Sequence, residues 1–171
     1  MRHCLSILLL VALSAAAPLL ASPAIGDSAP GFVGKGVDDR PVRFDPTDRT
    51  RPALVLFWAT WCPYCKALMP HLQTVLASVG SESLDVYAVA VFEDGELDPA
   101  AELKARGQNF TLILEGEGIA GDYGVTGTPG LFLVGRDGKV RWFRASGADP
   151  AVVERELLQL LEPAPVERAA P

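Results

Sequence analysis

The sequence predicts an α/β layer fold with a mixed central β-sheet flanked by helices. Near-continuous apolar runs at 53–59 and 84–92 are separated by a segment of helical periodicity, which is typical of parallel strands joined by a crossover helix. Two later runs, 131–134 and 140–145, flank an Asp-Gly step that indicates an antiparallel hairpin. We therefore expect parallel and antiparallel strands in one sheet.

The overall composition indicates one packed domain without a nucleic-acid partner. The chain has 171 residues, 49% of them hydrophobic, and a net charge of −6. Binding to a phosphate backbone needs a concentrated basic surface, and no long single-sign charge block is present. The basic residues of 136–144 alternate with other side chains, so we interpret them as a solvated strand face.

Residues 1–24 are predicted to be a signal peptide. Arg2 gives a positive start, the stretch 5–13 is an apolar core of the usual length, and small residues surround the expected cleavage after Ala24. An uncleaved membrane anchor is the alternative, but Pro18 interrupts a stretch that is already short for a spanning helix. We expect a periplasmic or otherwise exported protein, membrane-anchored if the leader is retained.

Ahead of the first long strand, 32–33 and 41–44 are predicted to pair as a short N-terminal β-hairpin. The strand 53–59 is apolar throughout, which indicates a central position covered on both faces. The next segment is predicted to be a helix that starts after Cys62 and stops at Gly80. Its expected apolar face consists of Leu68, Leu72, Val75, Leu76 and Val79.

The second half of the chain continues the alternation of strands and helices. After the strand 84–92, Asp98 is expected to cap a helix that begins at Pro99. A short strand at 111–114 and a helical turn at 119–123 precede the terminal hairpin.

The last helix is predicted over 150–161, with Asp149 as its cap. The folded domain is therefore expected over 25–162, and the tail 163–171, rich in proline and alanine, is expected to be disordered. The expected core-facing residues of the last helix are Val152, Val153, Leu157, Leu160 and Leu161.

Two of the three cysteines, Cys62 and Cys65, form a Cys-x-x-Cys pair, while Cys4 is expected to leave with the signal peptide. A pair so close in sequence constrains little unfolded-chain entropy, so it is a poor structural staple. A metal site is not expected, because zinc and copper need further ligands and the chain has only 2 histidines. The pair instead predicts a redox dithiol whose reactive form is the thiolate.

The stretch Phe57-Trp58-Ala59-Thr60-Trp61-Cys62-Pro63-Tyr64-Cys65, set between a strand and a helix, resembles the thioredoxin superfamily, and most closely its TlpA/ResA-type envelope thiol-disulfide oxidoreductases. The distant Gly127-Thr128-Pro129 ahead of an apolar strand supports the resemblance. It implies a thioredoxin-like fold, here with an N-terminal hairpin extension. It also implies that Pro129 is cis, borders the cysteines and displays the preceding backbone groups to a substrate peptide.

The resemblance also implies a role for each site residue. Cys62 is expected at the helix N-terminus, where the macrodipole stabilises its thiolate, and as the more exposed sulfur. Cys65 is expected to resolve the mixed disulfide that Cys62 forms with a substrate. The alternative interpretations are that Trp61 is a core tryptophan and that Pro129 is an ordinary turn proline. The full supporting set is Trp61, Pro63, Tyr64, Thr128 and Pro129.

The predicted function is an exported thiol-disulfide oxidoreductase that reduces specific envelope protein disulfides. The resemblance implies substrates in cytochrome c maturation or metal-site assembly and a membrane electron donor. We expect protein thiols and disulfides as partners, no cofactor, and a monomer. A dithiol oxidase or isomerase is one alternative, and a non-enzymatic metallochaperone or binding module is another. A peroxidase is disfavoured, because peroxiredoxins carry a threonine where this chain has Ala59.

Three departures from the family pattern concern the tuning of the site. Leu56 stands where thioredoxins have a buried aspartate, and Leu68 stands where ResA-type proteins have a glutamate. Glu93, at the exit of a neighbouring strand, is a hypothetical substitute as proton acceptor for Cys65, against the alternative of a solvated loop acid. The Pro-Tyr pair between the cysteines leaves the redox potential open within about −270 to −120 mV.

Overall fold

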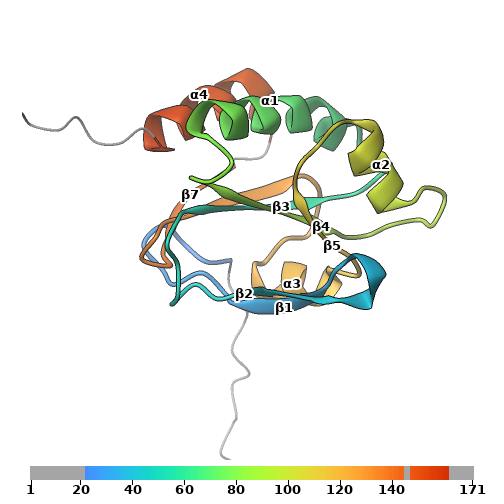
Figure 1. Cartoon of the computed structure of the whole chain (residues 1–171), viewed down its shortest axis with the longest axis horizontal. Helices are drawn as coiled ribbons and strands as arrows, with labels where there is room; N and C mark the ends of the chain where they lie inside the picture. Colours follow the sequence, from blue (N-terminus) through green and yellow to red (C-terminus); the bar gives the residue numbers. More distant parts are fainter. Residues whose placement is uncertain (1–21, 145–146, 162–171) are drawn as a thin grey trace, which may run out of the picture.

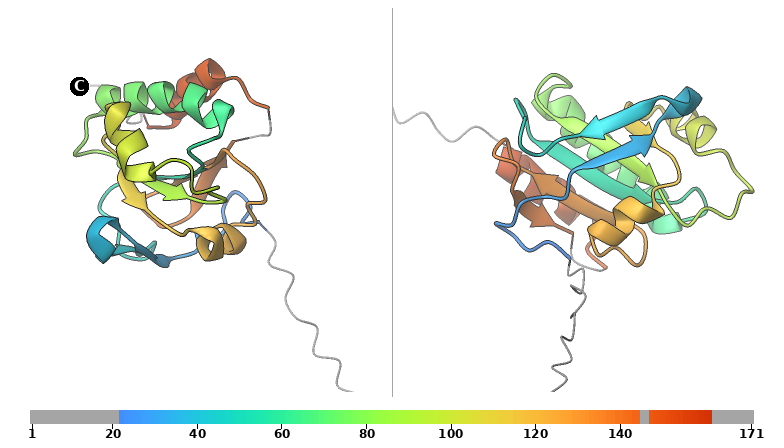
Figure 2. Two further views of the ribbon diagram at one scale, coloured as in Figure 1. Left: turned by 90° about the vertical axis from the view of Figure 1, so that its right-hand side faces the viewer. Right: turned by 90° about the horizontal axis from the view of Figure 1, so that it is seen from below.

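The computed structural model describes residues 22–144 and 147–161 of the chain. One face of a five-stranded sheet carries the helices α1 (Pro63–Val79), α2 (Pro99–Ala105) and α4 (Pro150–Leu161), as Figure 1 shows. A β-hairpin and the short helix α3 (Glu117–Asp122) cover the opposite face (Figure 2). This arrangement confirms the predicted mixed sheet flanked by helices. The predicted signal peptide up to residue 21 and the predicted tail lie outside the described residues.

The sheet has the strand order β5-β4-β3-β6-β7. Its central strand β3 (Ala53–Trp58) runs parallel to β4 (Asp85–Ala90), which in turn pairs in parallel with β5 (Thr111–Ile113). On the other side, β6 (Gly130–Val134) is antiparallel to β3, and β7 (Val140–Phe143) is antiparallel to β6. Every residue of β3 is buried, which explains its uninterrupted apolar sequence.

Helix α1 packs on the sheet through the apolar face that its sequence predicts. Gly80 ends the helix with a φ of 88°, a conformation that favours glycine, and its N–H donates to Leu76 O at 3.0 Å. On the far side, His71 Nδ1 lies 2.5 Å from Glu154 Oε2 and links α1 to α4. The buried residues of the face are Leu68, Leu72, Val75 and Leu76, and Val79 is partly buried against them.

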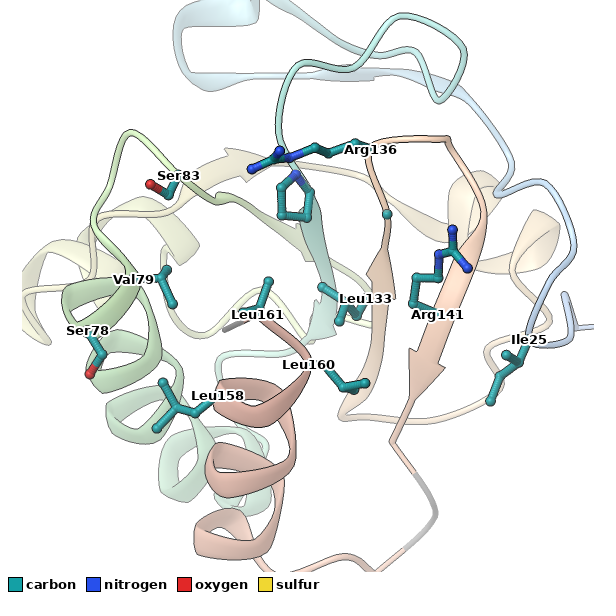
Figure 3. Close-up of a pocket in the computed structure, with 12 residues that line it drawn as sticks. Ile25, Ser78, Val79, Ser83, Leu133, Arg136, Arg141, Leu158, Leu160 and Leu161 are labelled. Atoms are coloured by element: carbon teal, nitrogen blue, oxygen red, sulfur yellow. The ribbon is translucent and has the colours of Figure 1, made fainter. Parts of the chain in front are cut away.

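The caps predicted for two helices are both confirmed. Asp98 Oδ1 accepts from Ala100 N at 3.0 Å at the start of α2, and Asp149 Oδ1 accepts from Ala151 N at 2.8 Å at the start of α4. The prediction of a core-facing side chain in α4 is wrong for one residue. Leu160 is 49% exposed, because the last turn of the helix borders an open cavity and not the packed core (Figure 3).

The predicted N-terminal hairpin is also confirmed. Strand β1 (Phe32–Lys35) is antiparallel to β2 (Pro41–Phe44), and a 3-10 turn over Val37–Asp39 joins them. The rings of Phe32 and Phe44 stack 4.9 Å apart and meet the Tyr87 ring edge-on, so the hairpin seals one face of the sheet with aromatic side chains.

The residues that precede the predicted boundary at 25 pack on the domain. Ser22 Oγ donates to Tyr123 O at 3.0 Å, and Pro23 is buried. Further along, Gly26 N donates to Val140 O at 2.8 Å, so the segment follows the outer edge of β7. In the part of the chain that the structure describes, no helix combines the length and apolar character needed to cross a bilayer.

These contacts predict that a chain starting at Ser22 is more stable than a chain starting at Ile25. The shorter chain loses a hydrogen bond worth about 0.5–1.5 kcal/mol and the burial of one proline ring. We expect its melting temperature to fall by roughly 3–8 °C in thermal unfolding. Ser22→Ala in the longer chain removes the hydrogen bond alone and should give a smaller decrease. Equal melting temperatures for all three proteins would contradict the packing of residues 22–24.

Candidate active site

The two cysteines lie where the central strand ends and α1 begins. Cys62 is the N-cap residue of α1, and its Sγ accepts a hydrogen bond from Cys65 N at 3.2 Å. The Cys62 N–H donates to Ala59 O, also at 3.2 Å. Both thiols are free and buried, with exposed fractions of 2% for Cys62 and 0% for Cys65. The predicted position at the helix N-terminus is confirmed, and Cys62 is the more exposed sulfur by only a small margin.

The environment of Cys65 favours its neutral thiol. Burial raises the pKa of Cys65 to about 12, and the hydrogen bond and charge of Cys62 act in the same direction. Hydrogen bonds from the Ala59 backbone and the Thr128 side chain act in the opposite direction but are weaker. Cys65 therefore carries its proton at neutral pH, and any reaction that turns it into a nucleophile has to remove that proton.

The distant Thr-Pro step lies at the same site. The Thr128–Pro129 peptide bond is cis, as the family resemblance implies, and the Thr128 side chain is close enough to Cys65 to lower its pKa. Immediately after it, Gly130 pairs with Phe57 of the central strand. A Cβ at Gly130 would lie 3.0 Å from Val125, so a larger residue at this position would crowd the loop. The two motifs that the sequence pairs are therefore brought together.

Two tryptophans near the cysteines have opposite environments. Trp58 is buried at 2% exposure and belongs to the core, as its place on the strand predicts. Trp61 is 46% exposed, and its Nε1–H donates to Phe92 O at 2.7 Å. The alternative interpretation of Trp61 as a core residue is therefore wrong. Its exposed ring lies next to Cys62 in the sequence and offers a flat contact surface beside it.

A glutamate after β4 holds the loop that carries Cys62. Thr60 N donates to Glu93 Oε1 at 3.0 Å, and Thr60 Oγ1 donates to Glu93 Oε2 at 2.5 Å. Phe92 N donates in turn to Glu117 Oε1 at 2.9 Å. Glu93 is not among the groups that perturb the Cys65 pKa. These contacts favour a role in holding the active-site loop, and the role of proton acceptor stays a hypothesis.

Thr60, Phe92 and Glu117 were not predicted as site residues from the sequence. The available signal was the order of the strands, because parallel neighbours β3 and β4 end at one edge of the sheet and bring their exit loops together. The contact between Thr60 and Glu93 follows from that topology.

A groove of about 740 Å³ opens between Tyr64, at the start of α1, and the Thr128–Pro129 step; neither cysteine lines it. Tyr64, 70% exposed, stands at one side of it, and Thr128 and Pro129 line it. Pro63 is exposed at the first position of α1. Arg144 also lines the groove and is partly buried, so the predicted solvated strand face is wrong at this residue. All seven predicted site residues thus lie within or next to one region of the molecule.

A second, larger cavity lies at the other end of the sheet (Figure 3). It has a volume of about 1030 Å³ and includes Pro52, just before β3, and Val79, at the end of α1. No cysteine lines it among the residues described. The described residues also contain no group of three or more His, Cys, Asp or Glu side chains placed to hold a metal ion.

The profile of the AhpC/TSA family matches residues 25–143, which include both cysteines and Pro129. The chain belongs to the AhpC/TSA family. This AhpC/TSA-family protein is 32% identical over 148 residues to the thiol:disulfide interchange protein DsbE of Escherichia coli K12, which covers 84% of this chain and 77% of that protein. It is 29% identical over 120 residues to the thiol-disulfide oxidoreductase ResA of Geobacillus thermodenitrificans, covering 69% and 67% of the two chains.

Solved structures confirm the thioredoxin-like fold of this AhpC/TSA-family protein. A thiol:disulfide interchange protein from Bacteroides sp. superposes with a TM-score of 0.72 at 18% identity, over 87% of this chain and 97% of that one. A DsbE-type protein from Chlorobium tepidum gives a TM-score of 0.66 at 29% identity, over 82% and 99% of the two chains. Because its relatives are thiol-disulfide interchange proteins and oxidoreductases, the chain belongs to the enzyme class of protein-disulfide oxidoreductases.

The raised pKa of Cys65 predicts unusual alkylation kinetics in a Cys62→Ser variant. Because burial is the main cause of the shift, we expect Cys65 to stay protonated at pH 8, where a pKa near 12 leaves about one thiolate in ten thousand. Its reaction with iodoacetamide should keep accelerating between pH 9 and 11, where a free cysteine has levelled off. The urea-unfolded variant serves as the control. A folded protein whose rate levels off near pH 9 would contradict the assignment.

The contact between Thr60 and Glu93 predicts the behaviour of Glu93→Gln. Losing the charge-assisted hydrogen bonds should lower the free energy of unfolding by about 1–2 kcal/mol in urea titration. The pH dependence of cysteine alkylation should stay the same. Glu96→Gln, an exposed site in the same loop, is the matched control and should leave stability unchanged. A shifted pH profile in Glu93→Gln would instead support Glu93 as the proton acceptor.

Proposed function

We propose that this chain uses the Cys62–Cys65 dithiol to reduce specific disulfides of envelope proteins. The observation that carries the proposal is the arrangement of a helix-capping Cys62 above a more deeply buried, protonated Cys65, beside an open groove. In a dithiol of this kind, one sulfur can attack a partner disulfide while the second stays protonated and unreactive until the mixed disulfide has formed.

The reaction has two balanced steps. The Cys62 thiolate attacks one sulfur of the substrate disulfide, a mixed disulfide forms, and the other substrate sulfur leaves as a thiolate. Cys65 then loses its proton and attacks Cys62 Sγ, so the Cys62–Cys65 disulfide closes and the second substrate thiolate leaves. Two electrons pass to the substrate, which takes up protons from Cys65 and from water.

The surroundings of the sulfurs suit these steps. The Thr128 side chain lowers the pKa of Cys65 and can stabilise the negative charge that develops there as the proton leaves. Trp61, exposed beside Cys62, provides a flat apolar surface for a protein substrate. Tyr64, Thr128 and Pro129 line the groove that an extended substrate segment would occupy. Pro63 fixes the first turn of α1 and has no N–H of its own.

The physiological setting forms part of the proposal. The predicted leader directs the protein to the periplasm or keeps it anchored at the membrane, and the oxidised form requires an electron donor, for which a membrane dithiol protein is the natural source. The substrates proposed are disulfides formed by the cysteines of apocytochrome c or of metal sites, as the family resemblance implies. We propose that the protein works as a monomer.

Activity and trapping with cysteine variants test the proposal. Wild-type protein should accelerate insulin reduction by dithiothreitol, and Cys62→Ser should reduce the rate to the uncatalysed background. Cys65→Ser should accumulate a mixed disulfide with envelope proteins, since nothing resolves it. The double variant is the control for non-specific capture. Wild-type turnover no faster than that of Cys62→Ser would overturn the oxidoreductase mechanism and favour a binding module. Catalysis of thiol oxidation alone would favour the dithiol oxidase.

A further inference from the structure

We infer that Arg144 selects substrates that carry a carboxylate close to the reactive disulfide. The inference rests on the proposed function and narrows its substrate class. Arg144 lies at the end of β7 and lines the groove beside the cysteines, together with Tyr64, Thr128 and Pro129. It therefore borders the groove in which the proposed function places a substrate segment.

Arg144 is the one formally charged residue among the described residues that line this groove. The others are glycine, serine, threonine, proline, apolar or aromatic residues. They give an extended peptide shape and apolar contact but no charge recognition. The side chain that can distinguish an acidic from a basic substrate segment is thus the guanidinium of Arg144.

The guanidinium is held in place from the side of the protein. Arg144 Nη2 donates to Ala148 O at 2.8 Å, while Arg144 N donates to Leu131 O at 2.9 Å and fixes the backbone on β6. Arginine has five N–H donors. The Arg144 Nε is buried without a hydrogen-bond partner, and the bond to Ala148 uses one Nη2 N–H, so three Nη donors are left for a ligand. A donor group anchored in this way loses little entropy when a ligand binds.

The charge of Arg144 is not neutralised by a carboxylate within the described residues. Other arginines there do have such partners: Arg49 and Arg51 pair with Asp85, Arg106 with Glu102, and Arg141 with Asp137. A partly buried guanidinium without an ion pair favours an anion, because the charge is only partly solvated. In a chain of net charge −6, a cation placed in the groove acts against the overall repulsion of acidic substrates.

A bidentate contact between this guanidinium and a carboxylate is the chemistry we expect, with the aspartate or glutamate of the substrate lying within a few residues of its cysteine. The interaction orients the segment along the groove and presents the disulfide sulfur to Cys62. Selection by charge is a difference in transition-state binding between an acidic and a basic substrate, so it is measured as the ratio of their reduction rate constants.

Matched peptides test the inference. Three oxidised peptides with one intramolecular disulfide each, flanked by Glu, Gln or Lys, are reduced by pre-reduced protein in single turnover, and each rate is divided by that of the same peptide with dithiothreitol. We expect the wild type to prefer the Glu peptide over the Lys peptide by about five-fold at low salt. The preference should shrink at high ionic strength. Arg144→Gln should abolish it, and Arg144→Lys should retain part of it.

Arg136→Gln is the matched control, because it removes the same charge from the exposed turn of the same hairpin, on the rim of the other cavity (Figure 3). It should keep the wild-type ratio. Equal normalised rates for all three peptides, or an unchanged ratio in Arg144→Gln, would overturn the role of Arg144 while leaving disulfide reduction intact. Failure of the wild type to reduce any peptide would instead refute the proposed function. Thermal unfolding of each variant shows whether it is folded.

Discussion

The burial of Cys65 beneath Cys62 is the constraint on which the rest of the site depends. A sulfur at 0% exposure keeps its proton, and this holds only because the central strand, α1 and the Thr128 loop surround it. The first sulfur caps the helix, while the second lies fully buried in the core. One dithiol thus contains a group placed for attack and a group placed for resolution, and their difference comes from depth in the fold.

The loops around the dithiol give the site two different sides. On one side, the hydrogen bonds between Thr60 and Glu93 connect the active-site loop to the exit of β4, and Trp61 donates a hydrogen bond to the Phe92 carbonyl. On the other side, the groove leads past Thr128 to Arg144. The first side is closed by hydrogen bonds within the protein, whereas the second keeps donor groups free. The two sides thus offer different groups, the aromatic ring of Trp61 on one and the cation of Arg144 on the other.

Strong local patterns made most of the fold predictable from sequence. The buried strands read as unbroken apolar runs because both of their faces are covered, and the capping aspartates and Gly80 marked helix ends through their own backbone chemistry. The cysteines and Pro129 were recognised from a spaced motif. What sequence could not supply was pairing across loops, as between Thr60 and Glu93. Arg144 looked like its exposed neighbours because alternation alone does not show where a strand ends beside a groove.

The N-terminal segment touches both outer strands of the main sheet. Ser28 bridges to Lys139 next to β7, and Lys35 bridges to Leu114 next to β5. Each partner lies far along the chain, so neither contact can form until most of the polypeptide has been made. An outer strand presents unpaired backbone groups to other chains, and these two bridges cover part of the backbone beside each outer strand. The short stretch that precedes the domain's first long strand thus helps to protect both edges of the sheet against pairing with another chain.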